Sequence, residues 1–343
     1  MGYRHFHVPT ARDVRWAHAV NSRAALAEAL RDERVHMLEA DLLMARGAPR
    51  SEDGTGAEDA VPTAEDVLMC HPPSRASDLT FREFLDRVTA HLVHGGRPVG
   101  VKLDFKELDC VAPCLALMRA RGVGACVGSN PGGGGGGGAH AAHAEESGVD
   151  DEARVRCMPV WLNADVVRGP GGRDPIAADA FVEACVEACP EATLSLGWTH
   201  TGTPVLGYTQ EMVDEMLTLV GRLPQHVTFA ASAAHLYASA SGPRESIIAH
   251  VNGEERPGST EKWSAPSAAE DALPIDDAVG ADHAARRPRS FTLWGPAPWI
   301  VRRWMTRELH PERTYVDVKE CTRLEMLVIH LYAVIRPLYS RFA

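Results

Sequence analysis

Three carboxylates stand near the ends of two apolar segments of this sequence, where they could hold a metal ion. Glu39 and Asp41 lie in HMLEADLL, and Asp104 lies in GVKLDF. Residues i and i+2 of a strand point to the same face, so Glu39 and Asp41 would converge, although such a pair is more often a solvated edge. Three carboxylates in one pocket repel one another by about 4 kcal/mol per pair at ~4 Å and an effective dielectric constant of ~20. Hard oxygen ligands without a neighbouring cysteine predict one divalent cation, Mg²⁺ or Ca²⁺.

Two histidines, His18 and His71, are the candidate proton carriers, because imidazole titrates near neutral pH. His18 follows an apolar segment, and His71 lies in CHPP, where two prolines restrict the path of the chain. A lone histidine at the end of a strand is more often a packed residue, and we assign that role to His36. The sequence therefore predicts acid–base chemistry beside the carboxylates.

Two lysines flank Asp104 with a period of two residues, so Lys102, Asp104 and Lys106 are expected on one face of a strand. Lys102 lies deep in the apolar run VGVKLDF, where an unpaired ammonium group is costly, so it requires a carboxylate or phosphate partner. Lys106 lies nearer the end of the strand and would neutralise a phosphate oxygen. This spacing favours an anionic substrate.

Short apolar segments alternate with amphipathic segments along the chain. Strands are expected at residues 14–20, 35–43, 67–70, 99–105, 158–163, 193–198, 227–230 and 290–294. Helices are expected at residues 22–31, 79–92, 108–121, 177–188 and 210–220. This alternation predicts an α/β fold with parallel strands, and eight strands would close a TIM-type (β/α)8 barrel. An open doubly wound sheet is the alternative, but no GxGxxG motif follows the first strand.

Two segments interrupt this pattern and are expected to be low-complexity loop insertions. The first, at about 124–152, contains seven consecutive glycines, and the second, at about 241–288, is rich in Gly, Pro, Ser, Ala and charge. Neither has the hydrophobic periodicity of a packed element, and both are expected to be mobile. The rest of the chain has nearly the length of a typical barrel, about 250 residues. A single barrel domain over residues 12–343 is therefore predicted.

The expected strands end in polar or aromatic side chains, although buried parallel strands are usually apolar throughout. These side chains are His18, Glu39 and Asp41, His71, Asp104 with Lys106, Asn163, Trp198 and Trp294. The carboxyl ends of barrel strands surround the mouth at which catalysis occurs. We therefore expect one site at this end, with Lys102, Asn163, Trp198 and Trp294 as candidate substrate contacts.

Composition restricts the partners of the chain. Its 343 residues include 46 acidic and 35 basic side chains, a formal net charge of -11, which argues against binding an extensive nucleic-acid tract. No apolar run approaches the roughly 18 residues of a transmembrane helix, and MGYRHFHVPT lacks the apolar core of a signal peptide. Eight cysteines without a CxxC motif fit a reducing compartment, so a cytoplasmic location is expected. No motif indicates an oligomeric state.

Taken together, these motifs resemble the menorin family. The matching segments are WAHAVNS, HMLEADLL, CHPP, GVKLDFK, VWLNAD and LSLGWT, in family order, with a weaker match at FTLWGP. That family is similar to the phospholipase-C-like phosphodiesterases, which include glycerophosphodiester phosphodiesterases and sphingomyelinase-D-like toxins. The resemblance implies a TIM-type barrel with one divalent cation. It implies Glu39, Asp41 and Asp104 as metal ligands and His18 and His71 as the catalytic pair. It also implies Lys106 beside the third ligand and Trp294 as the aromatic residue of the last strand. Asn21 and Asn163 would be substrate or supporting groups.

The function that this resemblance implies is metal-dependent hydrolysis of a phosphodiester, with the two histidines as general acid and base. The expected soluble substrates are an RNA end or nucleotide with a 2′,3′-cyclic phosphate, or a glycerophosphodiester; lysophospholipids also fit. One alternative is a non-catalytic recognition or adhesion protein on a retained barrel, because relatives of menorin act in extracellular recognition. Another is a metal-free barrel that binds a sugar or phosphate. The presence of all three carboxylates and both histidines favours the enzyme.

Overall fold

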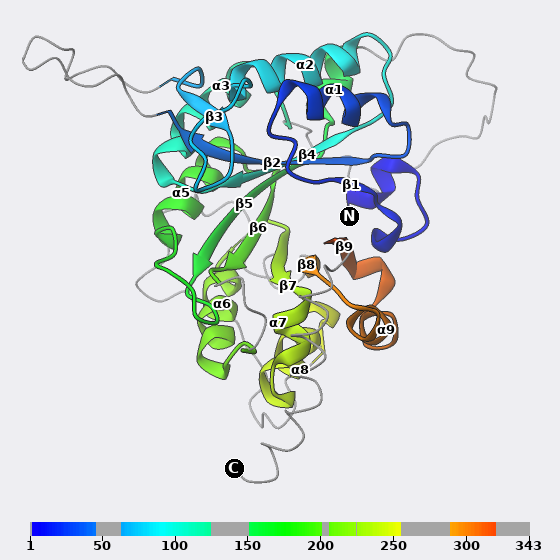
Figure 1. The fold of residues 1–343 in the computed structure, drawn as a ribbon, viewed down its shortest axis with the longest axis vertical. Helices are drawn as coiled ribbons and strands as arrows, with labels where there is room; N and C mark the ends of the chain where they lie inside the picture. The colour runs from blue at the N-terminus through cyan, green and yellow to red at the C-terminus, as the bar shows by residue number, and fades with distance from the viewer. Residues whose placement is uncertain are drawn as a thin grey trace, which may run out of the picture.

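Parallel strands alternate with helices and form a nearly closed barrel (Figure 1). The computed structural model describes residues 2–45, 63–124, 151–200, 206–223, 225–254 and 289–319. Within these ranges, eight strands lie side by side in the order β1 (Trp16–Ala17), β2 (Met37–Met44), β4 (Gly100–Phe105), β5 (Val160–Val167), β6 (Thr193–Trp198), β7 (Val227–Ser232), β8 (Arg289–Pro296) and β9 (Thr314–Lys319). The prediction of a TIM-type α/β barrel is confirmed.

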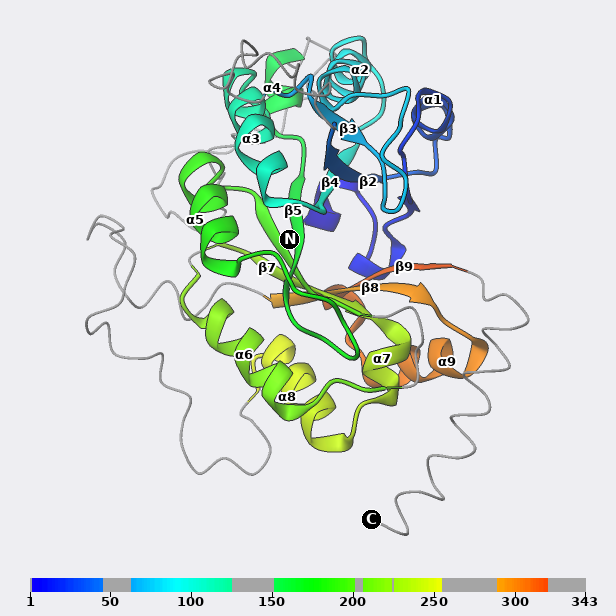
Figure 2. The same cartoon turned by 60° about the vertical axis from the view of Figure 1, so that its left-hand side comes forward.

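Helices surround the strands on the outside, as Figures 1 and 2 show from two directions. They are α1 (Arg23–Arg31), α2 (Phe81–Val93), α3 (Val111–Ala120), α4 (Asp151–Arg156), α5 (Ala178–Ala188), α6 (Gln210–Gly221), α7 (Ala233–Ala238), α8 (Ser241–Asn252) and α9 (Trp299–Glu308). Hydroxyl side chains start four of them, because Ser22, Thr80, Thr209 and Ser232 each accept a backbone N–H from the first turn. Within the described part of the chain, no helix has both the length and the apolar character needed to cross a bilayer.

The eighth barrel strand is not the one predicted from the sequence. β3 (Val67–Met69) pairs antiparallel with β2, with Met69 opposite Leu42, so the segment at 67–70 does not join the parallel barrel. The last barrel strand is β9, which pairs parallel with β8 and was not predicted. Its sequence TYVDVK nevertheless has the alternating, β-branched pattern of a strand. His71 consequently lies in the loop after β3 and not at the end of a barrel strand.

The second predicted insertion begins later than expected, because α8 occupies residues 241–252. Its buried positions are Ser246, Ile247, Ala249 and Val251, which give the helix an inward face. The composition of this segment suggested a loop, but the proline at position 243 lies in the first turn of the helix, where proline is tolerated. Residues 255–288 and 125–150, which hold the remainder of both predicted insertions, lie outside the described residues.

The N-terminal segment packs against the barrel at the amino ends of its strands. Tyr3 and Phe6 form one apolar cluster with Met37 of β2, Trp161 of β5 and Tyr315 of β9. These three strand residues stand at the first or second position of their strands. The cluster therefore fills the amino end of the barrel, and residues before position 12 take part in the packing.

Candidate functional site

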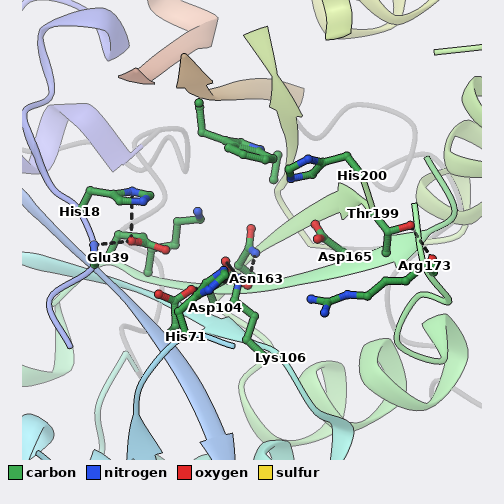
Figure 3. Close-up of a pocket in the computed structure, with 16 residues that line it drawn as sticks. His18, Glu39, His71, Asp104, Lys106, Asn163, Asp165, Arg173, Thr199 and His200 are labelled. Carbon is green, nitrogen blue, oxygen red and sulfur yellow. Dashed lines mark hydrogen bonds and ion pairs between the residues drawn. The ribbon is translucent and has the colours of Figure 1, made fainter. Parts of the chain in front are cut away.

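A cavity of about 640 Å³ opens at the carboxyl ends of the barrel strands (Figure 3). Its walls come from β2, β4, β5, β7 and β8 and from the loops that follow β1, β3, β4, β5 and β6. The predicted site residues that line it are His18, Glu39, Asp41, His71, Lys102, Asp104, Lys106, Asn163 and Trp294. Residues from segments far apart in the sequence thus share one cavity, as their positions at strand ends predicted.

The register of the central strands brings the three carboxylates together. Asp41 of β2 is directly paired with Asp104 of β4, and Glu39 lies two residues before Asp41 on the same face. One oxygen atom from each of these carboxylates lies within 4.8 Å of the others. Glu39 and Asp41 are 1% and 4% exposed, so water does little to screen their mutual repulsion.

Two asparagines orient these carboxylates. The amide of Asn21 donates to Asp41 Oδ2 at 2.7 Å, and its carbonyl accepts the backbone N–H of Asp41 at 2.9 Å. Asn163 donates to Asp104 Oδ1 at 2.7 Å and accepts the hydroxyl of Ser195 at 2.6 Å. Asn163 also lines the cavity, whereas Asn21, the other asparagine that the resemblance implied for the site, does not. Both amides therefore hold acidic side chains in place.

Lys106 neutralises part of the acidic charge. Its ammonium group lies 3.0 Å from Asp41 Oδ1 and 2.6 Å from Asp104 Oδ2. Burial alone would lower the pKa of Lys106, but the negative charges of Asp104 and Asp41 outweigh it and raise the pKa. Lys102 is 3% exposed and lines the same cavity. Among the described residues, no hydrogen bond or ion pair reaches the ammonium of Lys102.

The electrostatic balance differs between the buried carboxylates. Burial is the main cause of the raised pKa of Glu39, and repulsion from Asp41 and Asp104 adds to it against the attraction of Lys102 and His18. Burial would also raise the pKa of Asp41, but the charge of Lys106 and hydrogen bonds from Asn21 and Lys106 lower it overall. Of these two carboxylates, Glu39 is thus the one that the protein itself neutralises less.

The two histidines reach the cavity from different loops. His18 Nδ1 lies 2.8 Å from Asp317 Oδ2 and 3.1 Å from Glu39 Oε2. These carboxylates favour a proton on Nδ1, so the ring presents Nε2 as its second functional atom. His71 Nδ1 donates to the carbonyl of Pro72 at 2.6 Å, which likewise leaves Nε2 as the other ring nitrogen. Both rings line the same cavity as the acidic cluster.

Trp198 is corrected from a candidate substrate contact to a packing residue. Its indole is 1% exposed and packs against Tyr208 and Phe229. Its Nε1–H donates to the carbonyl of Met212 in α6 at 3.0 Å. Neighbouring residues of a strand point to opposite faces, and Trp198 takes the face that meets the helices. The two residues after it, Thr199 and His200, line the cavity instead.

Further cavity residues were not predicted from the sequence: Asp165, Arg173, Thr199 and His200, together with Asp317, which contacts His18. Asp165 follows Asn163 by two residues on β5, so the two side chains share one face of the strand, as Glu39 and Asp41 do on β2. This spacing would have indicated Asp165 as a cavity residue. Asp317 required recognition of β9 as a strand. Arg173 lies in a loop whose path depends on tertiary contacts.

The donor set fits a divalent cation. Glu39, Asp41 and Asp104 offer oxygen atoms only, which suits Mg²⁺ or Ca²⁺ better than a soft transition metal. Lys106 contacts only two of the three carboxylates, so a cation bound between them would relieve the repulsion that remains. A second set of groups within the same distance joins His18, Glu39 and Asp317. Glu39 belongs to both sets.

The fold and this cavity define an α/β barrel with an acidic, histidine-flanked pocket at the carboxyl ends of its strands. The sequence profile of the Menorin N-terminal domain matches residues 11–125 and 148–250. The chain therefore belongs to the menorin family, as its motifs predicted. The human Protein FAM151B is 31% identical to it over 233 residues, which cover 67% of this chain and 66% of that protein, just under two thirds of its length. No solved structure shows significant similarity to the chain.

Proposed function

We propose that this chain is a metal-dependent phosphodiesterase with two histidines as general acid and base. The proposed substrate is a soluble phosphodiester, either a nucleotide or RNA end with a 2′,3′-cyclic phosphate or a glycerophosphodiester. The observation that carries the proposal is the convergence of three carboxylate oxygens within 4.8 Å in a cavity that two imidazoles also line. Negatively charged pockets repel phosphate esters, so such an arrangement needs a cation to bind one.

Glu39, Asp41 and Asp104 would hold the cation. A divalent cation bound there would supply Lewis-acid stabilisation of the negative charge on the reacting phosphoryl group. Lys102, which is buried and faces the cavity, would pair with a non-bridging phosphate oxygen. Lys106 is already paired with two carboxylates and would keep them oriented.

The histidines would move the protons. His18, held through Nδ1 by Asp317, would accept through Nε2 a proton from the attacking water or neighbouring hydroxyl group. His71, with Nδ1 bonded to the Pro72 carbonyl, would donate through Nε2 to the leaving oxygen. In the reverse direction the two roles exchange, so the same pair serves both formation and opening of a cyclic diester.

The activity is tested by a substrate screen with phosphorus NMR as the readout. The full chain is incubated with Mg²⁺ or Ca²⁺ and with 2′,3′-cyclic nucleotides, glycerophosphodiesters and lysophospholipids. Metal-dependent conversion of at least one diester, abolished by a chelator, is the expected result. Saturable binding of these esters without conversion would instead support a recognition protein on a retained barrel. Binding that is insensitive to metal would support a metal-free phosphate- or sugar-binding barrel.

Asp317→Asn is expected to lower kcat by about 10- to 100-fold with little change in KM, as loss of a partner behind a functional group commonly does. The carboxylate at 2.8 Å fixes the proton and the orientation of the His18 ring, and the amide removes its charge while keeping its size. Steady-state kinetics on a substrate found in the screen measure this effect. Asp109→Asn, a change at the barrel exterior in the short helix Leu108–Cys110, is the matched control. Unchanged kcat in Asp317→Asn would remove Asp317 from the mechanism.

A further inference from the structure

The part of the cavity away from the acidic cluster has polar side chains that the proposed mechanism does not use. It is formed by Asp165, Arg173, Thr199, His200 and Trp294, which we call the distal subsite. In Figure 3, Asp165 lies near the middle of the cavity, Arg173 extends toward the centre from the loop after β5, and His200 lies on the opposite wall. These residues therefore surround the space next to the reacting phosphate.

Asp165 faces this space without a partner among the described residues. Its carboxylate makes no hydrogen bond and no ion pair with them. Burial, and then repulsion from Asp104, raise its pKa to about 7, against the attraction of Lys106, Lys102 and Arg173. The carboxylate is accommodated because position 197 on β6 is glycine; a Cβ atom there would collide with Asp165 Oδ1. Asp165 is half-buried, and a partly desolvated carboxylate is costly unless a donor reaches it, so a ligand that donates hydrogen bonds would be stabilised here.

Arg173 is held at the cavity by its backbone. Thr199 Oγ1 donates to the carbonyl of Arg173 at 2.8 Å, and the Gly169 N–H donates to Thr199 Oγ1 at 3.3 Å. Gly171 forms an antiparallel bridge with His200. Gly172 packs so closely on Thr199 that a Cβ atom would collide with it. The loop after β5 is therefore fixed to the end of β6, and it presents the Arg173 guanidinium, which makes no side-chain hydrogen bond or ion pair with the described residues.

An aromatic wall completes the distal subsite. The indole of Trp294 at the end of β8 and the ring of His200 have centroids 4.5 Å apart and planes inclined at 48°. Both residues are partly exposed and line the cavity. A flat or ring-shaped organic group can pack against such a surface while its polar edge faces Asp165 and Arg173.

We propose that the distal subsite binds the hydroxyl-bearing alcohol of the phosphate ester, a sugar or polyol, whose hydroxyl groups donate to Asp165 and accept from Arg173. A hydroxyl group is both donor and acceptor, so it satisfies an isolated carboxylate and an isolated guanidinium together. This inference rests on the proposed function, because it places the phosphate of the same ester at the acidic cluster. It makes Asp165 and Arg173 the residues that select the alcohol.

Other ligand chemistries fit the distal subsite less well. A cationic headgroup would be attracted by Asp165 but repelled by Arg173 and by the two lysines of the cavity. A second phosphate group would pair with Arg173 but would meet the Asp165 carboxylate. An alkyl group would leave both charged groups without hydrogen bonds. A neutral polyol avoids each of these costs.

The test measures binding of three phosphate esters by isothermal titration calorimetry, with the full chain and Mg²⁺. Methyl phosphate carries no hydroxyl on its alcohol, whereas glycerol 3-phosphate and ribose 5-phosphate do. The wild-type chain is expected to bind at least one of these hydroxyl-bearing esters about 10- to 100-fold more tightly than methyl phosphate. A preference for ribose 5-phosphate alone identifies a sugar, and a preference for both identifies polyol hydroxyls in general. Asp165→Asn should remove most of the preference without weakening the binding of methyl phosphate, because it removes a negative charge from the cavity.

Two comparisons keep this test specific. Asp174→Asn removes a carboxylate from the same loop, but Asp174 is 87% exposed and pairs with Arg168 outside the cavity, so its binding profile should match the wild type. Gly197→Ala should reduce the preference as Asp165→Asn does, because it displaces the carboxylate without removing its charge. The inference is overturned if the wild type binds all three esters with equal affinity or binds none of them. It is also overturned if Asp165→Asn lowers the affinity for all three esters by the same factor. Hydrolysis of bis(p-nitrophenyl) phosphate by the wild type tests the proposed function separately, since that diester carries no hydroxyl group.

Discussion

Glu39→Gln is expected to abolish both the stabilisation of the chain by Mg²⁺ or Ca²⁺ and its turnover of a phosphodiester. Binding of a cation at about 100 times its Kd stabilises the folded state by about 2.7 kcal/mol, which for a chain of this size raises Tm by about 4 °C. The amide keeps the shape of Glu39 but loses the charge that the cation requires. Loss of several kcal/mol of Lewis-acid stabilisation corresponds to a decrease in kcat of about 10³-fold or more. Thermal unfolding with and without metal, and kinetics, measure the two effects.

In the absence of metal, Glu39→Gln should be at least as stable as the wild type. This comparison separates loss of metal binding from misfolding. Glu39 is 1% exposed and burial raises its pKa, so the wild-type chain bears a desolvation cost that glutamine reduces. Glu83→Gln, on the outer helix α2 where Glu83 pairs with Arg23, is the matched control and should keep the full response to metal. An unchanged thermal shift in Glu39→Gln would contradict the assignment of Glu39 as a ligand.

His18→Ala and His71→Ala are each expected to lower kcat by about 10²- to 10⁴-fold, the range for loss of a general acid or base. Both imidazoles line the cavity beside the carboxylates, and each presents Nε2 after its Nδ1 is bonded elsewhere. Assays with bis(p-nitrophenyl) phosphate and with 2′,3′-cyclic nucleotides, in the presence of metal, measure the loss. The former substrate has a good leaving group, so its hydrolysis should depend less on whichever histidine acts as the acid.

The histidine variants require a control for nonspecific effects of removing an imidazole. His94→Ala serves this purpose, because His94 is exposed at the end of α2, outside the cavity, and its ring bonds the carbonyl of Ala90 in its own helix. Its kinetics should equal those of the wild type. Undiminished turnover in both His18→Ala and His71→Ala would exclude the proposed acid–base pair.

The barrel could be predicted because its strands carry a repeated signal. Apolar runs that end in polar residues located β2, β4 and β5, and alternation with helices implied that these strands are parallel. The same signal was misleading at residues 67–70, where an apolar run forms an antiparallel partner of β2. Local sequence does not specify the partner of a short strand, since pairing is decided by the rest of the sheet. β9 was missed for the opposite reason, because its half-polar sequence differs from an apolar barrel strand.

The acidic half of the site could likewise be predicted, whereas Trp294 alone was predicted from the distal subsite. Glu39, Asp41 and Asp104 stand out because carboxylates interrupt buried strands. Trp198 was misassigned because a strand-end position alone does not say which face a side chain takes. Arg173 reaches the cavity only through contacts of its loop with Thr199, which no spacing in the sequence reveals. Residues fixed by strand periodicity were thus accessible to prediction, and those fixed by loop packing were not.

The most direct test of the account is a crystal of the chain soaked in Mn²⁺, which takes the place of Mg²⁺ and gives an anomalous signal. One peak is predicted at the carboxyl end of the barrel, within about 2.0 to 2.6 Å of oxygen atoms from Glu39, Asp41 and Asp104. If the ion is instead bound by His18, Glu39 and Asp317, His18 cannot be the proton carrier that the mechanism requires. The absence of any peak in the cavity would contradict metal-dependent catalysis by this chain.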